Sequence, residues 1–335
     1  MALGFGLLSA QRSADDPRTW EDVYRETLDL AELTDGLGFD SVWTTEHHFV
    51  DDGYMPSLLV TSAAIAARTE TIRIGTGVLL APLHDPIRLA EDAATVQVIS
   101  NGRLDLGLGL GWSATEFEAL GVDITERGKA MTEMLQILRR AWTGDPFSWS
   151  GDVYEIPELG VRPTPSTEIP LIIGGGVDAA VRRAARHADG FFSNASPDRF
   201  FEQVRVAHEE MELIGRDPGS FRWIYYGVMY PGDLDEIVAS AWHQSWKYSD
   251  MEESARRTGI AATPPLDEAM AQKIRKRIIG GSATEIVDTI GSLRARLDVP
   301  VEWVARSYFP DLPYDRQASI IEELASDVMP FLPTG

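Results

Sequence analysis

The residues best suited to chemistry lie in the stretch EHHF at positions 46–49, directly after a strand predicted over residues 40–45. Imidazole titrates near neutral pH, so a histidine that enters a ligand site can act as a general acid or base. Neighbouring side chains on a strand point to opposite faces. We therefore expect at most one of His47 and His48 to enter the site, unless the chain has already left strand geometry. No spacing typical of metal ligands accompanies the pair, and we predict no metal site.

Glycine-rich segments form the second group of candidate site residues. The segment 174–176 (GGG) ends a predicted strand and opens a predicted helix, so its N–H groups and the helix dipole point at one place. Such geometry binds a phosphate group without a basic side chain. The segment 107–111 (GLGLG) either leaves room inside the fold or lets a flat ligand come close. The segment 75–77 (GTG) suggests a bulge or a close ligand contact within its strand.

The elements that must position these residues are short apolar strands that alternate with longer amphipathic helices. Strands are predicted over residues 3–9, 40–45, 71–81, 103–111, 170–176, 190–194, 222–230 and 301–309. This order predicts a single α/β domain over residues 1–335, a (β/α)8 TIM barrel, with a doubly wound open sheet as the alternative. A small hairpin is expected at 147–165, and an insertion or lid with its own helix at about 247–281.

The composition limits the possible partners. The 335 residues include no cysteine and carry a formal net charge of -22, from 52 acidic and 30 basic residues. An excess of acid opposes binding to phosphate backbones and to anionic membranes, so nucleic-acid and membrane partners are disfavoured. The first apolar run, residues 3–8, has no basic segment before it, and no run reaches the roughly 18 apolar residues of a spanning helix. We therefore expect a soluble, cytoplasmic protein.

Several motifs occur together in an order that resembles the bacterial luciferase-like flavin-dependent monooxygenases. They are GLGFDSVWTTEHHF, TIRIGTGVLLAPLHDPIRLAEDAATVQVISNGRLDLGLGLGW, EFEALGVD, PLIIGGG and IIGGSATEIVDTI. The resemblance covers most of residues 1–195 and returns at 278–310, and it leaves out 247–281. It implies a (β/α)8 barrel that binds reduced FMN at the mouth formed by the C-terminal ends of the strands.

The resemblance also implies roles for individual residues. His47 matches the family's catalytic histidine, and His48 matches its neighbour. The residues matched to cofactor contacts are Gly77, Val78, Gly111, Trp112, Gly174, Gly175 and Gly176. The first two match the place where the family often has a non-prolyl cis peptide beneath the flavin ring. The next two fall near the flavin, and the last three match a backbone contact to its phosphate.

One position departs from the pattern of many FMN-binding members. Leu110 stands where they carry an arginine, and a Gly-Trp pair after it also occurs in the deazaflavin (F420) branch. FMN is therefore the expected cofactor, and F420 is the alternative.

The function implied by this resemblance is that of a two-component monooxygenase. It would take reduced FMN from a separate flavin reductase and use O2 to oxidise a small organic substrate. The alternatives are an F420-dependent oxidoreductase that transfers hydride without O2, and a non-catalytic flavin-binding barrel. Family members are commonly homodimers, and the apolar helix predicted at 58–67 could lie in such an interface.

Overall fold

The structure is a computed structural model that describes residues 2–333. Its main sheet identifies the fold. Its strands are β1 (Leu3–Leu8), β2 (Ser41–Thr44), β3 (Arg73–Thr76), β4 (Leu79–Leu80), β5 (Leu104–Gly109), β8 (Leu171–Gly174), β9 (Gly190–Ser193), β10 (Arg222–Gly227) and β13 (Val301–Arg306). Their hydrogen-bonded order is β3-β2-β1-β13-β10-β9-β8-β5-β4, and β3 also pairs with β5. Because β3 and β4 divide one predicted strand, this is the order of a closed parallel barrel. The predicted (β/α)8 class is confirmed.

The chain forms two compact units. The central unit is Ser57–Trp223, and the terminal unit combines the residues up to Pro56 with those from Ile224 onward. Both contain strands that are buried along their whole length, such as β1 in the terminal unit and β5 in the central unit. Burial along the whole strand is typical of parallel strands that are covered on both faces, and β5 buries even Asp105 among its apolar residues.

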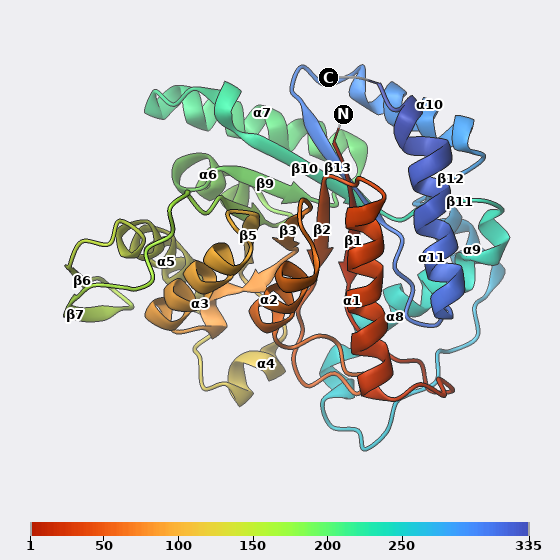
Figure 1. Cartoon of the computed structure of the whole chain (residues 1–335), viewed down its shortest axis with the longest axis horizontal. Helices are drawn as coiled ribbons and strands as arrows, with labels where there is room; N and C mark the ends of the chain where they lie inside the picture. Colours follow the sequence, from red (N-terminus) through yellow and green to blue (C-terminus); the bar gives the residue numbers. More distant parts are fainter. Residues whose placement is uncertain (1, 334–335) are drawn as a thin grey trace. The chain divides into compact units, whose positions relative to one another are not determined.

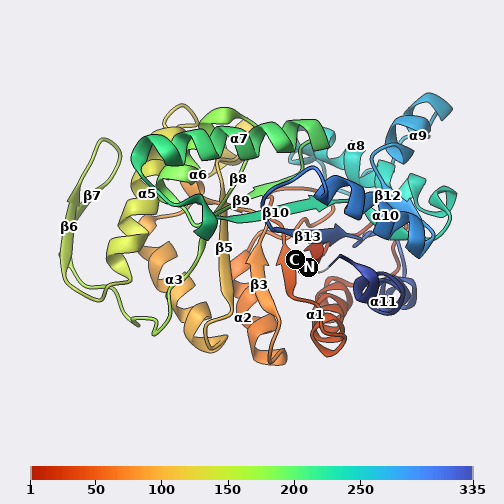
Figure 2. The same cartoon turned by 90° about the horizontal axis from the view of Figure 1, so that it is seen from above.

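The helices of the central unit are α2 (Leu58–Arg68), α3 (Pro86–Ile99), α4 (Ala114–Ala119), α5 (Arg127–Ala141), α6 (Asp178–His187) and α7 (Pro197–Ile214). Asp85 caps α3 by accepting hydrogen bonds from the first backbone N–H groups of the helix, and Gly215 ends α7 with a φ of 70°. Helices α6 and α7 lie side by side (Figure 2). The predicted hairpin is present beside α5, as antiparallel β6 (Phe147–Ser150) and β7 (Glu155–Leu159).

The helices of the terminal unit are α1 (Trp20–Gly36), α8 (Val238–Ser254), α9 (Glu268–Arg275), α10 (Ala283–Arg294) and α11 (Tyr314–Glu323). Helices α1 and α11 lie side by side although they come from opposite ends of the chain (Figure 1). Short strands β11 (Met229–Pro231) and β12 (Ile279–Gly281) pair in parallel. Among residues 2–333, no helix combines the length and the apolar character needed to cross a membrane.

Helix α8 extends further than the sequence pattern indicated. We expected an insertion or lid to begin at about residue 247, but α8, which begins at Val238, continues to Ser254. Lys247 and Met251 lie one helical turn apart, and both are buried. The buried face of the helix therefore continues through a charged residue, which periodicity alone counts as the end of an apolar pattern.

Candidate active site

His47 lies beyond the end of β2, in a loop that has left strand geometry. Its backbone N–H donates to the carbonyl of Met55 at 3.3 Å, and the N–H of Met55 donates to the carbonyl of Ser9 at 2.8 Å. The loop is thus folded back against the end of β1, and its backbone groups are satisfied. The side chain of His47 is only 4% exposed, so this imidazole belongs to the interior of the terminal unit.

Two tyrosines hold the His47 ring edge to face. The ring centroid of Tyr54 lies 5.0 Å away at an interplanar angle of 86°, and that of Tyr248 lies 5.2 Å away at 79°. Such T-shaped contacts are favourable and restrict the rotation of the ring. Burial raises the pKa of Tyr54 to about 12, so this phenol stays protonated at neutral pH.

His48 has a different environment from its neighbour. A ring nitrogen of His48, Nε2, forms a hydrogen bond with Oε1 of Glu46 at 2.9 Å, and the Glu46 side chain is 1% exposed. The His48 ring also contacts Phe49, which is 46% exposed. The two histidines of the predicted site are therefore held by different partners, one by phenols and the other by a buried carboxylate.

A buried ion pair fixes α8 to the loop that carries His47. Lys247 on α8 pairs with Asp51 in that loop, and each side chain is 1% exposed. The Asp51 N–H donates to the hydroxyl of Ser254 at 2.8 Å, and the N–H of Ala261 donates to the Asp51 carboxylate at 3.2 Å. Burial favours a higher pKa for Asp51, but the hydrogen bonds from Lys247 and its other partners hold the pKa below its usual value. Because Tyr248 follows Lys247, this pair also positions the second phenol beside His47.

Asp52 lies next to this ion pair and has no exposed surface. The side-chain amide of Gln11 donates to one of its oxygens at 2.6 Å, and the N–H of Tyr54 donates to the other at 3.1 Å. Burial nevertheless raises the pKa of Asp52 from 3.8 to about 6. The folded state therefore binds the proton more tightly than the unfolded state. The resulting stabilisation is full below about pH 4 and is lost as the pH rises through about 6.

Asp52→Asn keeps the shape of the side chain without its charge. The substitution is expected to remove the loss of stability that Asp52 causes as the pH rises. The free energy of unfolding of the variant relative to the wild type should rise by about 2 to 3 kcal/mol between about pH 4 and pH 7. Urea unfolding at several pH values measures this difference. A difference that stays constant over the whole range would contradict the raised pKa of Asp52.

In the central unit, the side chain of Val78 occupies space that two glycines leave. The Gly77–Val78 peptide is cis, as the resemblance implied for this place. A Cβ atom at Gly109 would lie 2.4 Å from Cγ2 of Val78, and one at Gly174 would lie 2.7 Å from Cγ1. Both distances are far below carbon–carbon contact. At both positions glycine leaves room for a neighbouring side chain. For Gly109 this is the first of the two interpretations of the segment 107–111, whereas Gly174 was expected to contact a phosphate group.

Residues 175–176 follow β8 with an exposed backbone and lead into α6. The N-cap residue of α6, Val177, gives no side-chain hydrogen bond to the first N–H groups of the helix. Arg199 of α7 donates to the carbonyl of Gly176 at 3.2 Å and pairs with Asp178 at 2.5 Å. Helix N–H groups without a side-chain cap, close to a guanidinium, are suited to bind a phosphate group.

Gly111 and Trp112 follow the end of β5. Gly111 has a φ of 73°, and a Cβ atom there would lie 2.9 Å from a ring carbon of Phe117, so both conformation and space favour glycine. Trp112 is 39% exposed, which is high for an indole. An exposed indole at the C-terminal end of a strand can offer its face to a flat ligand.

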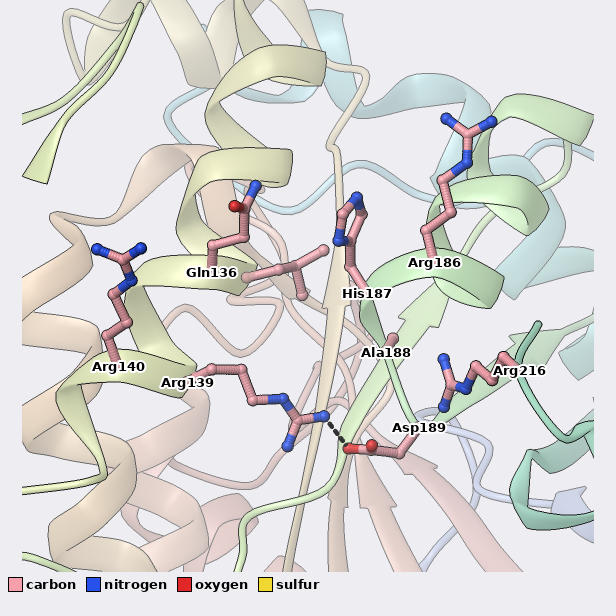
Figure 3. A pocket seen from close by; sticks show the side chains of 9 residues that line it. Gln136, Arg139, Arg140, Arg186, His187, Ala188, Asp189 and Arg216 are labelled. Carbon is pink, nitrogen blue, oxygen red and sulfur yellow. Dashed lines mark hydrogen bonds and ion pairs between the residues drawn. The ribbon is translucent and has the colours of Figure 1, made fainter. Parts of the chain in front are cut away.

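A basic cavity of about 460 Å³ on the central unit lies at the opposite, N-terminal ends of the strands (Figure 3). Ala188 and Asp189 in its wall directly precede β9. Its basic residues come from the last turns of α5 and α6 and from the turn after α7: Arg139, Arg140, Arg186, His187 and Arg216. Cations at helix C-termini offset the helix dipoles, and Arg139 also pairs with Asp189 at 2.5 Å. The basic character of the cavity is thus explained by charges that stabilise the helix ends. The cavity is not lined by the glycine segment 174–176.

Three residues of this arrangement were missed by sequence reasoning. Tyr248 lies in the segment predicted as irregular, so no helical position could be given to it. Arg199 belongs to the strand–helix unit after the glycine loop, and only the contact between α6 and α7 brings it to Gly176. Tyr54 had a usable signal, since it is an aromatic residue in the same short loop as His47.

Comparisons with known proteins agree with the sequence pattern. A family model described as luciferase-like monooxygenase matches residues 1–306. The oxygenase component of the flavin-dependent trigonelline monooxygenase of Acinetobacter baylyi is 32% identical over 48% of this chain and 45% of the relative. The chain thus spans about half the length of this curated relative.

Two further proteins align over nearly the whole chain. The F420-dependent glucose-6-phosphate dehydrogenase of Amycolatopsis mediterranei is 31% identical over 92% of this chain and 94% of the relative. The solved structure of monooxygenase RslO1 from Streptomyces bottropensis superposes with a TM-score of 0.80, covering 98% of this chain and 99% of that chain. At 23% sequence identity, this last likeness supports the barrel fold alone.

Proposed function

Because the chain belongs to the luciferase-like monooxygenase family, we propose that it is the oxygenase component of a two-component flavin-dependent monooxygenase. It would use reduced FMN and O2 to oxidise a small organic substrate. The observation that carries this proposal is the environment of His47, a buried imidazole held between two phenols beyond the C-terminal end of β2. Barrel enzymes carry their chemistry at such strand ends.

The central unit offers residues that fit FMN. The N–H groups of residues 175–176 and of the start of α6, together with Arg199, would hold the phosphate. Val78 and Trp112 would contact the flavin ring, and glycine at 174 is required so that Val78 keeps its place. Arg199 would compensate for Leu110, which stands at the position of the usual arginine.

Reduced flavin supplies the electrons for O2, and the residues of the chain control protons and water around it. His47 would give or accept a proton at an imidazole nitrogen. Tyr54 and Tyr248 orient the His47 ring and exclude water from it. Excluding water limits the uncoupled reaction, in which hydrogen peroxide is released in place of oxidised product. The buried pair Lys247–Asp51 keeps α8, and with it Tyr248, in position.

An F420-dependent oxidoreductase that transfers hydride is the second candidate. Two observations favour it: the relative from Amycolatopsis mediterranei aligns along nearly the whole chain, and Leu110 departs from the FMN pattern. The same His47 would then serve as the acid or base for a hydroxyl or carbonyl group of the substrate.

Anaerobic spectral titration of the purified protein with each reduced cofactor tests these two functions. We expect FMNH2 to bind with a Kd of about 10 µM or lower, and reduced F420 to bind at least about tenfold more weakly. Tighter binding of reduced F420 than of FMNH2 would favour the F420-dependent oxidoreductase over the monooxygenase. Tight FMNH2 binding without any turnover, in the presence of a flavin reductase and O2, would instead indicate a non-catalytic flavin-binding barrel.

The proposal includes a separate flavin reductase as partner, a cytoplasmic location and a homodimer. Val60 on α2 is 73% exposed and Val98 on α3 is 53% exposed, so apolar side chains are available to a second copy of the chain. Sedimentation velocity tests the assembly, and a monomeric mass at micromolar concentration would contradict it.

A further inference from the structure

Arg306 ends β13 at the same edge of the sheet as the candidate catalytic loop. Strand β13 pairs in parallel with β1, with Arg306 opposite Gly6, and β1 pairs in parallel with β2. The C-terminal ends of these three strands therefore lie at one edge of the sheet. His47 follows the last of them, so Arg306 and His47 belong to the same end of the terminal unit.

The charge of Arg306 is not offset by the part of the chain that the structure describes. Within residues 2–333, its side chain forms no hydrogen bond and no ion pair, and its Nε atom is buried without a partner. The residue as a whole is half-buried. A partly desolvated guanidinium without a partner lowers the stability of the fold, because lost hydration is not replaced.

Two phenols lie within electrostatic range of Arg306, and neither supplies a negative charge. The positive charge of Arg306 acts on Tyr54 and Tyr226, yet burial raises the pKa of both, in Tyr54 to about 12. Both phenols are therefore protonated at neutral pH. Tyr54 is also the phenol that contacts the His47 ring at 5.0 Å. Tyr54 thus contacts the candidate catalytic imidazole and also lies within electrostatic range of the unpaired guanidinium.

An arginine that serves packing in the same unit is bonded very differently. Arg18 forms ion pairs with Asp16 and Glu26 at 2.6 and 2.7 Å, and it donates to the carbonyl of Pro310 at 2.8 Å. Arg306 has none of these interactions among the described residues, so a structural ion pair does not account for an arginine at this strand end.

We propose that Arg306 binds the carboxylate of the substrate, so that the site takes small organic acids. This inference rests on the proposed function, because it names the substrate class of the same site. A guanidinium presents its N–H donors in a planar fork that matches a carboxylate. A substrate held there has its remaining atoms beside Tyr54, and hence near His47. The destabilisation by the unpaired charge is relieved when the acid binds.

The test compares Arg306→Met and Arg306→Lys with the wild type and with Arg256→Met, which removes an exposed arginine from the same unit. The probe is sodium acetate, a carboxylate small enough to enter any site that accepts a larger acid, against sodium chloride at equal ionic strength. Thermal unfolding midpoints and anaerobic FMNH2 titrations are measured for each protein.

We expect acetate at roughly ten times its Kd to raise the midpoint of the wild type by about 2 °C more than chloride does. Arg306→Met should lose this response, Arg306→Lys should keep part of it, and Arg256→Met should keep it in full. Without acetate, Arg306→Met should unfold about 2 °C higher than the wild type, because the unpaired charge is gone. FMNH2 binding should be unchanged.

Other outcomes overturn the proposal. Equal effects of acetate and chloride on the wild type, an acetate response that survives in Arg306→Met, or failure of this variant to fold would each do so. Loss of FMNH2 binding in Arg306→Met would assign the guanidinium to the reduced flavin instead of the substrate. If FMNH2 fails to bind the wild type, the proposed function fails, whereas the acetate comparison still decides the role of Arg306.

Discussion

His47→Ala is expected to lower the rate of coupled substrate oxidation by about a hundredfold or more, while FMNH2 binding is retained. Positioned general acids and bases contribute roughly this much to a rate, and the proposed phosphate contacts lie in residues remote in sequence from His47. The reduced flavin should still react with O2, so hydrogen peroxide should be released in place of oxidised product. Product formation, peroxide release and flavin titration measure the three quantities.

His48→Ala is the matched control for this experiment, because it removes the neighbouring imidazole. His48 is hydrogen-bonded to Glu46, whereas the two phenols hold His47 edge to face, so the loss of His48 should reduce coupled oxidation less than the loss of His47 does. Turnover of His47→Ala at the wild-type level would remove His47 from the mechanism. A larger effect of His48→Ala would transfer the proposed role to His48.

Lys247→Met is expected to lower the free energy of unfolding by about 3 kcal/mol. The substitution keeps the apolar length of the side chain but leaves the Asp51 carboxylate, 1% exposed, without its main counter-charge. Arg257 lies 3.4 Å from the same carboxylate but is one-third exposed, so it offsets only part of the loss. Coupled oxidation should fall as well, since Tyr248 loses its support. Urea unfolding measures the first effect and steady-state assays the second.

Two variants calibrate this prediction. Lys273→Met removes an exposed lysine of α9 and should change the free energy of unfolding by less than about 0.5 kcal/mol. Asp51→Asn combined with Lys247→Met removes both charges of the pair and should recover more than half of the lost stability. A loss below about 1 kcal/mol in Lys247→Met alone would mean that α8 is held mainly by its apolar contacts.

The barrel could be predicted because its elements are locally encoded. Buried parallel strands such as β1 appear as short apolar runs, and helices such as α1 appear as repeats with helical spacing. Helix caps can be recognised in the sequence as well. Ser282 followed three residues later by Glu285 is a capping-box pattern, and both of its hydrogen bonds are present. The prediction erred at Lys247, where a buried charge depends on a partner at position 51.

The candidate site could be predicted only in part. His47, His48 and the glycine segments stand out by residue type and by their position after strands. The two phenols around His47, the guanidinium beside Gly176 and the unpaired charge of Arg306 do not stand out, because each is defined by its neighbours in space. The sequence around an arginine at a strand end does not indicate whether the folded chain supplies a partner for its charge.

The sequence by itself determined the alternation of strands and helices, the strand tip that carries the histidines, and the positions of the glycine segments after the strands. These follow from side-chain size and from periods of two and 3.6 residues, which are properties of short segments. Tertiary structure alone decided that α8 supports the His47 loop and that Arg306 has no counter-charge among the described residues. Charge pairing and burial depend on residues far apart in the chain, and only the folded arrangement brings them together or leaves them apart.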